Sequence, residues 1–173
     1  MVDLVEVAIM KKYIEGKVWR FSDNVDTDQI IPAKYLVTGD SRELAKHAFE
    51  NVRPEFAEEV RGGDIIVGGK NFGSGSSREH APRALLGAGV ACVIAPSFAR
   101  IFYRNSINIG LPLVECDIDA ADGVVLAIDF ENGKIVNTNT GSAYTFPPMP
   151  DFLVKLLDVG LIENTKRKLG GQL

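Results

Sequence analysis

The sequence is poor in cysteine and histidine, with two of each in 173 residues. Cys92 and Cys116 stand in separate apolar runs, and no Cys-x-x-Cys pair occurs. Zinc sites and iron–sulfur clusters need a larger set of such ligands, so we expect no metal bound by this chain alone. Unpaired thiols in apolar runs are typical of buried free cysteines in a reducing compartment, which predicts a cytoplasmic protein.

Long hydrophobic runs and a positively charged leader are also missing. No apolar run approaches the roughly 20 residues that a membrane span needs, and Asp3 and Glu6 stand where a signal peptide would carry positive charge. The net charge of −4 differs from that of proteins that coat nucleic acid or acidic membranes. We therefore expect neither nucleic acid nor a membrane as a partner.

What is present is an ordinary globular composition, with 46% hydrophobic and 24% charged residues. A chain of this length buries a full core, and we expect one domain over residues 1–173. Within it, the weakly patterned residues 1–15 predict an N-terminal arm, and residues 163–173 predict a solvated tail.

The middle of the chain alternates between strand and helix patterns, and the C-terminal third reads as antiparallel. Strands are expected at 17–21, 64–67, 90–95, 111–114, 124–130, 135–138 and 143–146. Helices are expected at 40–51, 78–86, 98–108 and 151–159. This order predicts an α/β fold with a mixed sheet, a βαβ-like core and antiparallel C-terminal strands.

Polar residues ahead of these helices predict their caps. Asp40 with Glu43, and Ser76 with Glu79, have the spacing of a capping box, and Ser97 is expected to cap the helix from residue 98. Pro54 is expected to end the segment that begins at Asp40.

The segment Gly68–His80 carries the most specific chemical signal, Asn-Phe-Gly-Ser-Gly-Ser-Ser-Arg-Glu-His from residue 71. Its glycines allow close backbone approach to a ligand, the N–H groups of the following helix favour an anion, and Arg78 suits a carboxylate. A dinucleotide loop is not predicted, because Arg78 and Glu79 replace the last glycine of that motif. A plain helix cap and an anion-binding loop both remain open from these residues alone.

Further motifs surround this loop: Gly-Lys-Val-Trp from residue 16, Asn-Val-Asp-Thr-Asp-Gln-Ile-Ile-Pro from 24, Ser-Phe-Ala-Arg-Ile from 97 and Asn-Ile-Gly-Leu-Pro from 108. In this order, over roughly residues 16–160, they resemble the swivelling domain of the aconitase superfamily in its free-standing form, the small subunits of 3-isopropylmalate dehydratase. The resemblance implies a swivelling β/β/α domain.

The resemblance also implies an activity and a partner. The expected enzyme is a hydro-lyase of leucine biosynthesis that interconverts 2-isopropylmalate and 3-isopropylmalate by dehydration and rehydration. It is expected to act only with a large subunit that carries a [4Fe–4S] cluster, in a heterodimer or heterotetramer. The small subunit of homoaconitase, or of a related dicarboxylate hydro-lyase, is an alternative. A non-catalytic anion-binding module is another.

The same resemblance gives roles to individual residues. Ser76 matches the family's catalytic base, and Asp28 matches an aspartate of the catalytic site. Ser77 and Arg78 match substrate-binding residues. Val37 falls where the family faces the variable group of the substrate, and where relatives that accept an extra carboxylate place an arginine.

Other polar residues have less specific expectations. His47 is expected to be exposed and His80 to make a structural hydrogen bond. Arg100, Tyr103 and Arg104 share one helical face, either solvated or part of a rim that meets the large subunit or the substrate.

Overall fold

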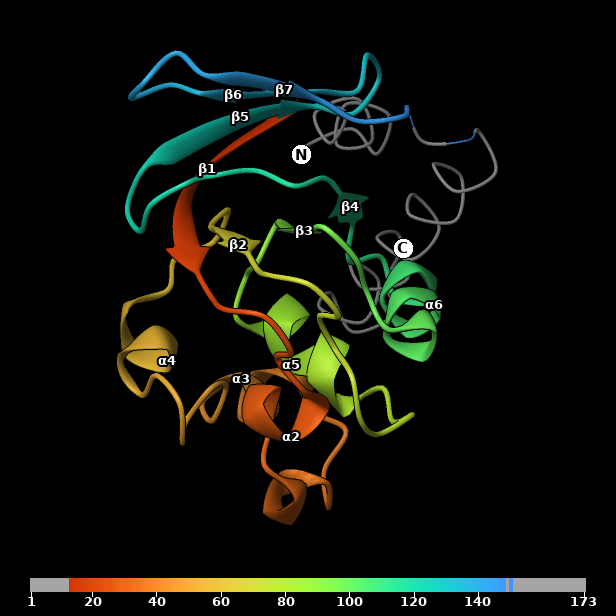
Figure 1. Ribbon diagram of the computed structural model, residues 1–173. Coiled ribbons are helices and arrows are strands. Elements are labelled where there is room, and N and C mark those ends of the chain that lie inside the picture. Colours follow the sequence, from red (N-terminus) through yellow and green to blue (C-terminus); the bar gives the residue numbers. More distant parts are fainter. Residues whose placement is uncertain (1–12, 149, 151–173) are drawn as a thin grey trace, which may run out of the picture.

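The structure, a computed structural model, describes residues 13–148 and residue 150, and these form a seven-stranded sheet with the order β4-β3-β2-β1-β5-β6-β7 (Figure 1). The strands are β1 (Tyr13–Arg20), β2 (Ile65–Val67), β3 (Cys92–Ala95), β4 (Leu113–Glu115), β5 (Val125–Asp129), β6 (Lys134–Asn137) and β7 (Ala143–Thr145). The helices are α2 (Thr27–Ile30), the 3₁₀ turn η1 (Ala33–Tyr35), α3 (Ser41–Ala45), α4 (Glu55–Glu59), α5 (His80–Gly87) and α6 (Arg100–Asn108).

Strand β1 joins two halves of different type. On one side it pairs in parallel with β2, and β3 and β4 continue the parallel half. On the other side it pairs antiparallel with β5, and β6 and β7 extend that half as a meander. The mixed sheet, the βαβ core and the antiparallel C-terminal strands are therefore confirmed.

Each face of the parallel half contributes to its own core. Trp19, Ile66 and Val93 face the helices, while the alternate residues Val18 and Ile65 face the other way. The second core also contains apolar residues of β5 and β6, because the sheet curls so that its antiparallel half covers the parallel one. Figure 1 shows β5–β7 on one side of the parallel strands and α2, α3 and α5 on the other.

The carboxyl ends of the parallel strands bring distant segments of the chain together. The N–H of Phe21, just after β1, donates to the carbonyl of Val67 at 2.9 Å. The N–H of Gly68, just after β2, donates to the carbonyl of Ile94 in β3 at 2.8 Å. The glycine-rich loop therefore starts at the edge of the sheet where open α/β sheets place ligands.

The helix predicted over residues 40–51 is much shorter in the structure. Asp40 caps α3 by accepting the N–H of Arg42 at 2.9 Å, without the predicted capping box with Glu43, and the chain continues after Ala45 in turns. Phe49 takes a left-handed backbone conformation, φ 56°, and buries its ring against Phe21 with centroids 4.1 Å apart. A left-handed residue at position 49 does not fit a right-handed helix that continues to residue 51.

Two neighbouring predictions also change. The prediction for Pro54 is wrong because this proline begins a helix, α4, as its N-terminal flanking residue. Helices α5 and α6 each begin two residues later than predicted, and neither has a side-chain cap. Ser97 instead accepts the N–H of Asn71 at 2.8 Å, so it holds the glycine-rich loop.

Several predictions lie outside the described residues. They are the arm over most of residues 1–15, the helix at 151–159 and the tail at 163–173. Within the described part of the chain, no helix is long and apolar enough to cross a membrane.

Candidate active site

The glycine-rich loop, residues 71–77, lies between two other segments of the chain. Parallel bridges join Ser74 to Asp26, ahead of α2, and Phe72 to Phe98, ahead of α6. The N–H of Thr27 donates to the carbonyl of Ser74 at 2.7 Å. Because backbone pairs hold both edges of the loop, its path does not depend on the loop sequence alone.

Gly73 sits where a side chain has no room. Its φ is +86°, and a Cβ at this position would overlap the ring of Phe102 in α6. Phe72 and Phe102 are themselves buried, with ring centroids 5.6 Å apart. Because the ring of Phe102 fills the space beneath the loop, glycine is the residue that fits at position 73.

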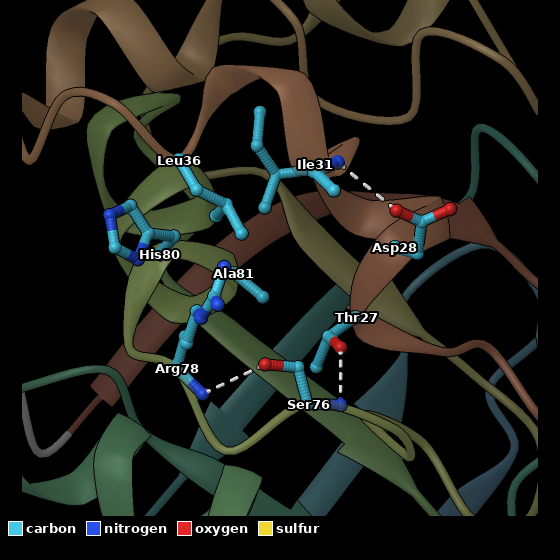
Figure 2. A pocket seen from close by; sticks show the side chains of 9 residues that line it. Thr27, Asp28, Ile31, Leu36, Ser76, Arg78, His80 and Ala81 are labelled. Atoms are coloured by element: carbon cyan, nitrogen blue, oxygen red, sulfur yellow. Dashed lines mark hydrogen bonds between the residues drawn. The ribbon is translucent and has the colours of Figure 1, made fainter.

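Ser76 is fixed through its backbone, while its hydroxyl remains available. Its N–H donates to Oγ1 of the buried Thr27 at 2.9 Å, and its own Oγ accepts the N–H of Arg78 at 3.2 Å (Figure 2). This second bond replaces the predicted capping pair with Glu79. An N–H donated to a hydroxyl oxygen favours its deprotonated form. One residue further, Asn105 donates to the carbonyl of Ser77 at 2.9 Å.

Ser76 lines a pocket of about 260 Å³. The pocket is lined by Thr27, Asp28, Ile31, Ala33, Leu36, Ser76, Arg78, His80 and Ala81. Figure 2 shows α2 and the η1 segment on one side, and the loop with the start of α5 on the other. A small acid that also carries an apolar group suits this mixture of polar and aliphatic side chains.

The structure brings together most of the residues that the sequence singled out. Ser76, Arg78 and Asp28 all line the pocket. The Oδ1 atom of Asp28 accepts the N–H of Ala33 at 3.1 Å, which ties α2 to η1. In the described part of the chain the exposed guanidinium of Arg78 has no ion-pair partner, so it is available to an anion.

Ser77 and Val37 are not among the lining residues. Ser77 is an exposed neighbour of the pocket. Val37 is 94% exposed, and the preceding residue, Leu36, lines the pocket instead. Sequence reasoning missed Leu36, Thr27 and Asn105. Thr27 lies inside the Asp-Thr-Asp motif, whereas the role of Asn105 follows only from the packing of α6 beside the loop.

The remaining polar candidates differ from one another. His80 lines the pocket, and its buried Nδ1 has no hydrogen-bond partner among the described residues. A structural hydrogen bond of His80 stays a prediction. Arg100 and Arg104 are exposed, while Tyr103 is half-buried beside Phe98. Neither reading of that helical face is tested by these contacts.

Comparison with known proteins gives this site its context. The family model of the aconitase C-terminal domain matches residues 54–117, which include the loop and α5. A 3-isopropylmalate dehydratase small subunit from Methanopyrus kandleri is 54% identical over 92% of this chain and 96% of its own length. A methanogen homoaconitase small subunit from Methanothermobacter thermautotrophicus is 56% identical over 90% of this chain and 91% of its own length.

A solved structure agrees with these sequences. The crystal structure of 3-isopropylmalate dehydratase from Methanocaldococcus jannaschii superposes with a TM-score of 0.83 at 42% identity, over 91% of this chain and 96% of that one. The chain belongs to the aconitase C-terminal domain family. It is a hydro-lyase small subunit of the 3-isopropylmalate dehydratase and homoaconitase group. A small subunit implies a large-subunit partner.

The described residues of this small subunit do not fit the iron–sulfur cluster of the superfamily. Cys92 is fully buried in β3, where burial raises the pKa of its thiol far above the ordinary value. Cys116 is half-buried, with its Sγ 3.6 Å from the carbonyl of Thr145, and burial raises the pKa of this thiol too. Across residues 13–148, no group of three or more His, Cys, Asp or Glu side chains could hold a metal ion.

Proposed function

We propose that this chain is the small subunit of 3-isopropylmalate dehydratase and isomerises 2-isopropylmalate and 3-isopropylmalate by dehydration and rehydration, in leucine biosynthesis. The observation that carries the proposal is the position of the Ser76 hydroxyl, which lies at the pocket while its oxygen accepts the Arg78 N–H at 3.2 Å. A serine without such support is a poor base.

In the proposed reaction, the Ser76 alkoxide removes the proton from the carbon next to the one that bears the leaving hydroxyl. The bonding pair of that C–H bond forms the double bond of the enoic acid while the hydroxyl leaves with its own bonding pair, and Ser76 carries the proton until rehydration returns it. The cluster of the large subunit would supply the Lewis acid that accepts the departing hydroxide. The N–H of Arg78 and its nearby positive charge stabilise the alkoxide. The bonds from Ser76 N–H to Thr27 and from Asn105 to the Ser77 carbonyl fix the backbone of the loop, which holds Ser76 at the pocket before proton transfer.

The other proposed site residues bind and orient the substrate. Arg78 pairs with a substrate carboxylate, since its guanidinium is free of internal carboxylates in the described structure. Ser77 adds a hydroxyl contact from the same loop. Asp28 supports the opposite wall by holding the N–H of Ala33.

The exposure of Ser76, Ser77 and Arg78 supports a site that is completed by another surface. We place the [4Fe–4S] cluster on that surface, the large subunit, because the described residues of this chain offer no matching ligand set. A heterodimer or heterotetramer satisfies this requirement. The two unpaired thiols, Cys92 and Cys116, support a reducing, cytoplasmic location.

The preference for an isopropyl group rests on residues 36 and 37. Leu36 presents an aliphatic side chain to the pocket, and Val37 next to it carries no charge that could pair an extra carboxylate. A substrate with such a carboxylate is the alternative, as in the homoaconitase relative. The exposed Val37 side chain would contact that part of the substrate only in the assembled enzyme.

The test is kcat/KM of the reconstituted complex for isopropylmalate and for homoaconitate. We expect isopropylmalate to be preferred, and Val37→Arg to shift the ratio toward homoaconitate. Val52→Arg, at another exposed valine, controls for the added charge. A wild-type preference for homoaconitate would establish the homoaconitase alternative, and binding of the acids without turnover would favour the anion-binding module.

A further inference from the structure

Next to the pocket residue Leu36, the carboxylate of Glu50 contacts several side chains. The hydroxyl of Tyr35 lies 2.9 Å and 2.7 Å from the two oxygens of Glu50. The ring of Tyr35 stacks on His47, with centroids 3.7 Å apart and an angle of 8° between the planes. His47 Nδ1 is 3.1 Å from Glu50, and the His47 side chain is half-buried, so the prediction of an exposed His47 is wrong.

The ionisation states of Tyr35 and Glu50 favour the hydrogen bond between them. The hydrogen bond to Glu50 raises the pKa of Tyr35 above its ordinary value, and the bond from Tyr35 lowers the pKa of Glu50. A neutral phenol and a charged carboxylate are thus both maintained around neutral pH. Lys34 Nζ, 3.9 Å from Glu50, adds a weak exposed ion pair.

Glu50 and His47 belong to a turn that is anchored in the core. Phe49, between them, is fully buried, and its N–H donates to the carbonyl of Ile30 at 2.9 Å. The ring of Phe49 also packs edge-on against Phe56, with centroids 5.0 Å apart. The turn that carries Glu50 is therefore part of the core, and Tyr35 is attached to a fixed point.

The segment held by Tyr35, residues 33–39, has few other attachments. Its start is tied by the bond from Ala33 to Asp28, and its end by Arg83 Nη1, which donates to the carbonyl of Gly39 at 3.3 Å. Between these ends, local bonds join Tyr35 to Pro32 and Thr38 to Asp40, and the side chains of Tyr35 and Leu36 pack against the core. The longer-range hydrogen bonds and ion pairs in the described chain are those of Lys34 and Tyr35 with Glu50. Leu36, the pocket residue, directly follows Tyr35.

We infer that Tyr35 is a positioning residue, which acts through Glu50 and His47 to hold Leu36 at the pocket and thereby sets the affinity for the variable group of the substrate. The inference rests on the proposed function, because it concerns the same pocket. The proposed base and carboxylate-binding arginine lie on the opposite wall, in the loop and before α5. Loosening residues 33–39 should therefore weaken substrate binding and leave the chemical step intact.

The experiment is a double-mutant cycle on the reconstituted complex with Tyr35→Phe, Glu50→Ala and both together. Tyr35→Phe keeps the stacked ring and removes only the hydroxyl. We expect each single variant to raise KM about tenfold with kcat within about twofold of wild type, and the double variant to be no worse than either single one. Glu50→Gln keeps an acceptor for the hydroxyl and should restore most of the wild-type KM.

The control is Glu43→Ala, which breaks an exposed ion pair of 2.8 Å with Lys46 in the same region and should leave KM unchanged. Additive effects in the cycle, or an unchanged KM in Tyr35→Phe, would overturn the inference. Should Glu50→Ala lose its fold, hydrogen exchange of the Leu36 amide in Tyr35→Phe and in wild type replaces the cycle. Faster exchange in Tyr35→Phe is expected, and equal or slower exchange would overturn the inference. The cycle is measured with whichever acid the wild type turns over, isopropylmalate or homoaconitate. If the wild type does not turn over isopropylmalate, the proposed substrate is refuted, and the cycle with homoaconitate still tests the role of Tyr35.

Discussion

At the scale of single residues, Ser76 and Arg78 divide the work of the proposed site. Ser76 is fixed by its backbone and presents its oxygen to the pocket. Arg78 donates its main-chain N–H to that oxygen, and among the described residues its guanidinium has no ion-pair partner. In the proposed reaction, the backbone of Arg78 supports the base and its side chain binds the substrate.

Arg78→Lys should separate these two contributions. The variant keeps the main-chain N–H and the positive charge but loses the planar fork that matches a carboxylate. We expect KM for isopropylmalate to rise about tenfold or more, with a smaller change in kcat. Arg42→Lys, at an exposed arginine outside the pocket, should change neither value. An unchanged kcat/KM in Arg78→Lys would remove its side chain from substrate binding.

The sequence was informative where a residue acts through its own chemistry. Ser76 and Arg78 were predicted because a guanidinium suits a carboxylate and because the motifs around their loop resemble those of the family. Leu36 and Asn105 could not be found this way. One is an ordinary aliphatic residue that faces the pocket only because η1 turns it there, and the other reaches the Ser77 carbonyl from a different helix.

At the scale of elements, the glycine-rich loop depends on what lies beneath it. Gly73 follows the buried Phe72, and the space that a side chain would need is filled by Phe102 of α6. Helix α6 therefore determines how closely the loop that carries Ser76 can pack onto the core.

Gly73→Ala should destabilise the protein more than a comparable glycine elsewhere. The strained φ and the overlap with Phe102 together predict a loss of about 3 kcal/mol in the free energy of unfolding. Gly141→Ala has a similar φ, +80°, but open space around it, and should cost about 1 kcal/mol. Urea unfolding of both variants measures the difference, and equal losses would show that Phe102 gives way freely.

The strands were more predictable than the ends of the helices. Short apolar runs bounded by glycine and polar residues correspond to β2, β3 and β4, because a buried strand must be apolar on both faces. The helix expected over 40–51 ended early since Phe49 is drawn into the core with a left-handed backbone. Ser97 holds Asn71 instead of capping α6, a contact between residues distant in the sequence.

At the scale of the whole molecule, the proposed site is a pocket of this chain that opens outward. Ser76, Ser77 and Arg78 are exposed around a pocket of about 260 Å³. A separate subunit that covers this surface would exclude water and complete the binding of a small acid.

The isolated chain should bind no iron. Its two cysteines lie in different segments, and Cys92 is too deeply buried to ligate a cluster. We expect iron and sulfide analysis of the purified chain to give background values, and the reconstituted complex to hold both. Stoichiometric iron on the lone small subunit would contradict this division.

The most direct test of the central claim is the turnover of isopropylmalate by the reconstituted complex with Ser76→Ala in place of the wild-type small subunit. Ser74→Ala, in the same loop but outside the pocket lining, is the matched control. Loss of the base predicts a fall in kcat of about 10²–10⁴-fold, with assembly and thermal stability unchanged and the control near wild type. Turnover close to wild type in Ser76→Ala, with the subunit folded and assembled, would show that this serine is not the base.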